Sequence, residues 1–116
     1  MQKLSLEAQA RELLAQATSS PGGRTAQTVM GGHERVLRQT VIAMIKDAEL
    51  SEHASPGEAS VYVLRGRVRL VAGGEAWEGR DGDLLVVPDG QHSLVALADS
   101  AVLLSVAKRR GRAVHR

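Results

Sequence analysis

Two of the four histidines, His53 and His92, lie in turn-rich segments beside short aliphatic runs. An imidazole can ligate a metal ion, and it can also donate or accept a hydrogen bond. Ser55 and Glu58 follow His53 closely. Alternate side chains of a strand share a face, so Ser55 is expected to point the same way as His53 and Glu58 the opposite way. The spacing therefore predicts that His53 and Ser55 share a face, and His92 is a further candidate for the same polar group.

Glu58 and His33 are conditional members of this group. A bulge at Pro56-Gly57 would turn Glu58 toward His53, and with His92 the three would form a two-histidine, one-carboxylate set suited to iron(II). His33 would complete a three-histidine site from a neighbouring loop, or it caps a turn in solvent. A metal-free pocket also remains open, because two histidines can hydrogen-bond each other or hold a small polar ligand.

The apolar residues follow two periodicities along the chain, a helical one near the N-terminus and a strand-like one in the rest. Residues 5–18 carry apolar side chains at helical spacing, with Ser5 as the N-cap and a stop at Ser19–Gly23. From about residue 25 the pattern changes to short β-branched runs separated by turn signals. These runs are Arg35–Ile45, Val61–Leu64, Arg67–Val71, Leu84–Val87, Ser93–Leu97 and Val102–Ala107. Strands at such short intervals predict an antiparallel sandwich or barrel.

Two details of the strand pattern lead to further predictions, one about a turn and one about a row of arginines. The Gly73-Gly74 pair predicts a hairpin turn with positive φ. Arg65, Arg67 and Arg69 alternate and are expected to form a basic stripe on one strand. That stripe would bind an anion, or its arginines would pair with Glu75 or Glu78 across the hairpin.

Two segments of the chain resemble the paired motifs of the cupin superfamily. The first runs from His53 to Gly66, and the second runs from Gly82 through Pro88 and Gly90 to His92. The family motifs are G-x5-H-x-H-x3–4-E-x6-G and G-x5-P-x-G-x2-H-x3-N, and the resemblance covers roughly residues 35–107. It implies an all-β, double-sheet jelly-roll barrel, here preceded by one helix. The expected organisation is a helix and linker over 1–22, a barrel over 23–107 and a basic tail over 108–116.

The departures from the family motifs concern the metal ligands. Aligned on His53 and Gly66, the opening glycine falls on Asp47, the second histidine on Ser55 and the glutamate on Ala59. In the second motif His92 comes one residue early, and the final asparagine position lies near Ala96. The resemblance thus implies a reduced ligand set of His53 and His92 in a pocket with Ser55 and Ala59. Two imidazoles alone predict weak binding of a divalent metal.

Composition excludes several other classes of function. The chain has no cysteine, which removes disulfides, thiol catalysis and cysteine-based metal sites, and 2% aromatic residues are too few for a base-stacking platform. The net charge of +2 divides into an acidic body and a tail of five basic residues at 108–116. The tail is expected to be a solvated end rather than a nucleic-acid site.

The expected function is small-molecule binding of a non-catalytic or a sensory kind, in the cytoplasm and with no membrane partner. The alternative is a metal-dependent cupin enzyme of dioxygenase or isomerase type that uses His53 and His92. A homodimer is expected as well, because the amphipathic helix and the apolar stretch of Arg35–Ile45 both need a covering surface. Small cupins similar to this chain commonly pair sheet to sheet.

Overall fold

The computed structural model describes residues 1–52 and 57–108. Helix α1 (Leu6–Ala17) and a 3-10 turn (Pro21–Gly23) precede the strands. The strands are β1 (Arg24–Met30), β2 (Leu37–Met44), β3 (Glu49–Glu52), β4 (Gly57–Arg65), β5 (Arg67–Ala72), β6 (Glu75–Arg80), β7 (Leu84–Val87), β8 (His92–Ala96) and β9 (Ser100–Lys108). The predicted all-β architecture with one N-terminal helix is confirmed.

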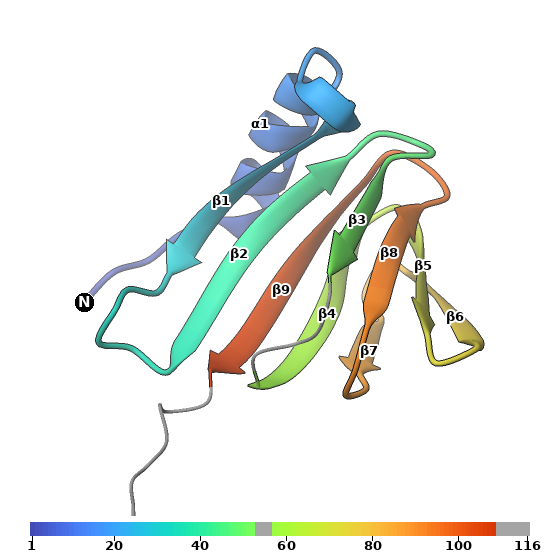
Figure 1. Ribbon diagram of the computed structural model, residues 1–116. Coiled ribbons are helices and arrows are strands. Elements are labelled where there is room, and N and C mark those ends of the chain that lie inside the picture. The colour runs from blue at the N-terminus through green and yellow to red at the C-terminus, as the bar shows by residue number, and fades with distance from the viewer. Residues whose placement is uncertain (53–56, 109–116) are drawn as a thin grey trace, which may run out of the picture.

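The strands form two antiparallel sheets that face each other (Figure 1). The larger sheet has the order β1-β2-β9-β4-β7, and the smaller has the order β3-β8-β5-β6. Strands distant in the chain therefore become neighbours, and β9 lies between β2 and β4. This arrangement brings the start of β4, the end of β5, the end of β7 and the start of β8 to one end of the barrel.

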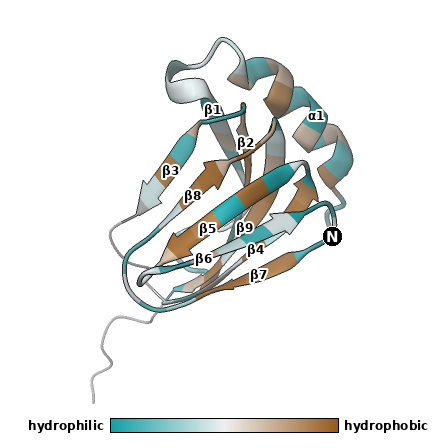
Figure 2. Ribbon diagram, turned by 90° about the vertical axis from the view of Figure 1, so that its right-hand side faces the viewer, coloured by the Kyte–Doolittle hydropathy of each residue, from teal (hydrophilic) through white to brown (hydrophobic). Residues whose placement is uncertain are grey.

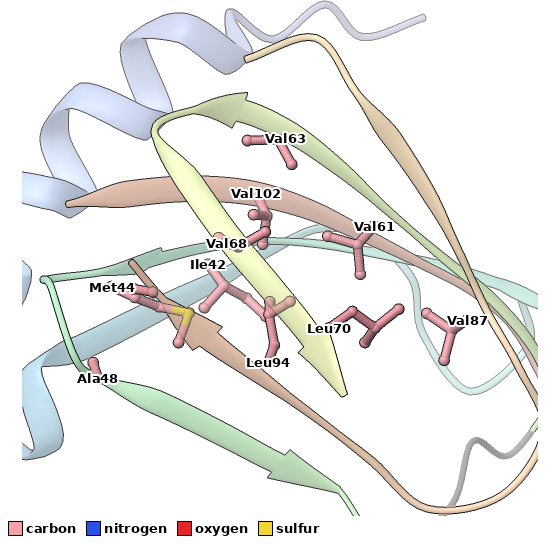
Figure 3. Packing of buried hydrophobic residues seen from close by; sticks show 11 residues of the cluster. Ile42, Met44, Ala48, Val61, Val63, Val68, Leu70, Val87, Leu94 and Val102 are labelled. Carbon is pink, nitrogen blue, oxygen red and sulfur yellow. The ribbon is translucent and has the colours of Figure 1, made fainter. Parts of the chain in front are cut away.

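The inner faces of the two sheets bury one aliphatic core (Figure 3). Alternation within each strand selects its members, since successive side chains point to opposite faces. Ile42 and Met44 of β2 enter this core from the larger sheet, and Leu70 and Leu94 enter it from the smaller. The core contains no aromatic ring, in agreement with the composition of the chain.

Helix α1 covers part of the outer face of the larger sheet, as the views in Figures 1 and 2 show. Ser5 caps the helix, because its side chain accepts a hydrogen bond of 3.1 Å from the amide of Ala8. Leu13 and Ala17 pack against Val41 and Ala43, which lie on the face of β2 opposite Ile42. The wholly apolar end of β2 is thus covered on both faces within one chain, so neither it nor the helix needs a second subunit.

Candidate functional site

His92 opens strand β8 and is half-buried. It borders a cavity of about 10 Å³ between the sheets, which is otherwise lined by aliphatic side chains. Those side chains are Ile42, Leu50, Val61, Leu70, Leu94, Val102 and Leu104. His92 also borders an open surface groove of about 750 Å³. The imidazole therefore stands between the apolar interior and solvent.

The backbone restricts how the His92 ring can bond. Nδ1 lies 3.5 Å from the carbonyl oxygen of Gly90, at the long limit for a hydrogen bond. A carbonyl oxygen only accepts, so Nδ1 is the donor in this contact. In a neutral ring with this tautomer Nε2 is an acceptor, and it has no hydrogen-bond partner among the described residues.

Alanines occupy two inward positions of the strands at this end of the barrel. Ala72 is the register partner of His92 on β5. Ala59 stands on β4, in register with Val87 and Val106, and packs against the core. The alignment places the family's glutamate at Ala59, and this residue does face inward. At both positions the side chain is a methyl group, which offers neither a hydrogen-bond donor nor an acceptor.

Glu58 lies on the other face of β4 from Ala59. It is exposed and borders an outer groove with Leu37, Ser60 and Ala107. The bulge was expected at Pro56-Gly57, and Pro56 lies outside the described residues. From Gly57 to Ala59 the register with β9 is regular, and Glu58 points outward there. Glu58 is therefore not brought together with His92.

The other expected site residues are not brought to His92 within the described residues. His33 is exposed in the loop between β1 and β2. His53 and Ser55 lie outside the described residues, so the structure places neither of them.

Metal binding can be tested against the donor set that the structure describes. A divalent metal needs at least three donor side chains for a stable site. Over residues 1–52 and 57–108, no three histidine, aspartate or glutamate side chains come together. Ala72, the register partner of His92, has no donor atom in its side chain. The described residues do not fit a metal ion.

The expected arginine stripe is divided by a turn. Arg65 ends β4, whereas Arg67 and Arg69 belong to β5, so a single stripe of three was wrong. The pairing across the hairpin is confirmed, since Glu78 lies 3.2 Å from Arg69 and 4.0 Å from Arg67. These ion pairs are half-exposed and contribute little to stability.

A second, apolar groove of about 390 Å³ lies between the edge strands β6 and β7. Trp77 lines it together with Leu70, Leu85 and Pro88. Leu70 also lines the interior cavity, so one side chain separates the two spaces. The sequence pattern indicated neither Leu70 nor Ala72 as a site residue, because both read as ordinary inward positions of a strand.

Comparison with known proteins agrees with the barrel. A family model described as Cupin domain matches residues 40–106. Among solved structures, a conserved protein of unknown function from Streptococcus pyogenes, SPY1581, is 28% identical with a TM-score of 0.70. That alignment covers 79% of this chain and 80% of the other. No curated protein sequence matches the chain.

Two further structures are similar. KdgF from a Halomonas species is 26% identical with a TM-score of 0.65, over 78% of this chain and 84% of that one. A salicylate 1,2-dioxygenase from Pseudaminobacter salicylatoxidans has a TM-score of 0.71 at 19% identity. It aligns with 86% of this chain over 33% of its own length, which shows a shared fold alone. Among the described residues, no helix is long and apolar enough to cross a membrane.

Proposed function

Because this chain belongs to the cupin family, we propose that it binds a small molecule at the open end of its barrel, with His92 as the polar contact. The proposal rests on the position of His92. Of the described residues that line the interior cavity, it alone has a polar side chain. A mostly apolar space with one or a few polar groups is the usual composition of a small-molecule site.

The bonding of the ring indicates the chemistry of the ligand. With Nδ1 directed to the Gly90 carbonyl, Nε2 accepts a hydrogen bond. The matching ligand carries a hydroxyl or N–H donor next to a compact apolar body. The interior cavity has room for about one water molecule, so the ligand's body would lie in the open groove that His92 and Ala72 line rather than in the core.

The proposed role is binding rather than catalysis. The interior cavity offers one imidazole and no other polar side chain among the described residues. The open groove is also lined by Glu49, Ser51, Asp89 and Ser93, but none of these described side chains is hydrogen-bonded to the imidazole. General acid–base or nucleophilic catalysis needs such partners within hydrogen-bond reach. The metal-dependent alternative would need His53 together with His92. Elemental analysis of protein purified without added metal tests it, and a stoichiometric first-row metal would favour the enzyme.

Phenol and anisole form a matched pair of probes for this site, because they differ only in the hydroxyl donor. We expect phenol to bind about three- to tenfold more tightly than anisole in calorimetric titrations, the ratio that one hydrogen bond provides. The His92→Phe variant keeps a ring and removes the nitrogen, so the preference should disappear. Equal affinities in the unaltered protein, or a preference that survives His92→Phe, would contradict the proposal.

A further inference from the structure

Strands β6 and β7 are edge strands of different sheets, so no ladder of hydrogen bonds closes the apolar groove between them. The two strands approach closely at Gly79, where an added Cβ would lie 3.1 Å from the side chain of Leu85. Glu75 and Trp77, which are farther from this contact along β6, line the groove. Its volume of about 390 Å³ lies within the range of small-molecule sites. We call it the β6–β7 groove.

Trp77 gives the groove an aromatic wall. It is the only tryptophan of the chain, and it is 65% exposed. Leu70 and Leu85 line the same groove and also pack in the core, so they form its floor. Among the aromatic side chains, the indole ring attracts cations most strongly. The groove therefore offers an apolar floor beside a ring that suits a positive charge.

Glu75 adds one carboxylate to this groove. It lies two residues from Trp77 on β6, so both side chains share a face of the strand. Glu78 lies on the opposite face, where Arg69 and Arg67 pair with it. Within the described part of the chain, no side chain forms an ion pair or a hydrogen bond with the carboxylate of Glu75. None of the described residues that line the groove is basic. Its one formal charge is thus negative and uncompensated.

We propose that the β6–β7 groove binds a small organic cation, in which an ammonium group is joined to a compact aromatic or aliphatic body. The ammonium group contacts the Trp77 ring and pairs with Glu75, and the apolar body lies on the leucine floor. A neutral ligand would displace water from the carboxylate without replacing its hydrogen bonds. An anion would be repelled by the same group. Charge complementarity therefore favours a cation over both.

The β6–β7 groove is separate from the proposed site at His92. Leu70 lies between the groove and the interior cavity and lines both, whereas His92 does not line the groove. The site at His92 selects a hydrogen-bond donor, and the groove selects a positive charge. The two proposals are therefore independent, and either can fail without the other.

The emission of Trp77 reports on the groove directly, because the chain has no other tryptophan. Benzylammonium and benzyl alcohol are a matched pair of probes, since they differ in the charged group. When the full chain is titrated at low salt, we expect a saturable change in emission. The dissociation constant should be about five- to tenfold lower for benzylammonium than for benzyl alcohol. High salt should reduce this preference, because the charges are exposed to solvent.

Glu75→Gln removes the charge and keeps the shape of the side chain. The preference for benzylammonium should fall by about two- to fivefold, and the fold should survive because Glu75 is exposed. Glu78→Gln is the matched control, since it makes the same change on the opposite face of β6. It should leave the preference unchanged. The comparison of the two probes needs no variant, so it decides the proposal even if a variant fails to fold.

Four results would overturn the proposal. The first is a Trp77 emission that does not respond to benzylammonium, as expected if a second copy of the chain covers the groove, or that changes without saturating. The second is equal affinity for the two probes. The third is a preference that Glu75→Gln leaves undiminished, and the fourth is a preference that is lost in Glu78→Gln.

Discussion

The backbone amide of Asp47 donates a hydrogen bond of 2.8 Å to the carbonyl oxygen of Ala96, and Asp47 holds this position with a φ of 76°. Among the described residues it is the one non-glycine with positive φ. The cupin motif has its opening glycine at this point of the alignment. The requirement for glycine is thus visible in the backbone, although the chain has an aspartate there.

Asp47→Gly should stabilise the protein. The left-handed conformation costs an L-residue about 1–2 kcal/mol, and glycine avoids this cost. Part of the gain is lost, because glycine has more conformational freedom in the unfolded chain. We expect a gain of about 0.5–1 kcal/mol in the free energy of unfolding, measured with urea. Asp47→Ala should destabilise the protein, and a stabilising alanine would refute the backbone explanation.

Ser100→Ala should weaken the junction between β5 and β9. Ser100 is fully buried, its hydroxyl accepts from the amide of Arg67 at 3.0 Å, and the carbonyl oxygen of Ala98 lies 2.7 Å away. Removing the hydroxyl leaves buried backbone groups without a partner, at a cost of about 1–3 kcal/mol. Thermal and urea unfolding measure this loss. The exposed Ser51 serves as the control, and Ser51→Ala should change stability by less than about 0.5 kcal/mol.

Leu13→Ala tests how firmly α1 is docked. Leu13 is 4% exposed and packs against Val41 and Ala43. Truncation of a buried leucine costs about 2–5 kcal/mol, so the urea midpoint should fall clearly. Arg11→Ala on the exposed side of the helix should have almost no effect. A small effect of Leu13→Ala would mean that the helix is not held by this contact.

The sequence pattern predicted best where alternation and burial agree. The range Leu84–Val87 was predicted as it occurs, and the Gly73-Gly74 turn has the expected positive φ at both residues. Strand β3 was not predicted, because the sequence ELSE has three polar residues in four. Its pairing with β8 holds it in the sheet, and a short-range pattern contains no information about that partner.

The site could be predicted only in part, for a similar reason. Alternation indicated that Glu58 faces away from the pocket, and the alignment put Ala59 at the position of the family's glutamate. In the structure Glu58 is exposed and Ala59 packs against the core. The juxtaposition of His92 with Ala72 depends on the register between β8 and β5. Strands β5 and β8 are separated in the chain by β6 and β7. The sequence of neither strand alone specifies how the two are aligned. The helix is a similar case, since its pattern required a covering surface but did not say that β2 of the same chain provides it.

The most direct test of small-molecule binding at His92 is a map of amide shifts in ¹⁵N-labelled protein titrated with phenol. The account predicts that the largest changes occur at Gly90, His92 and Ser93, which line the open groove, and that they become small in His92→Phe. Shifts centred instead on Trp77 and Leu85, in the groove between β6 and β7, would contradict it. So would the absence of any shift at the barrel end at saturating phenol.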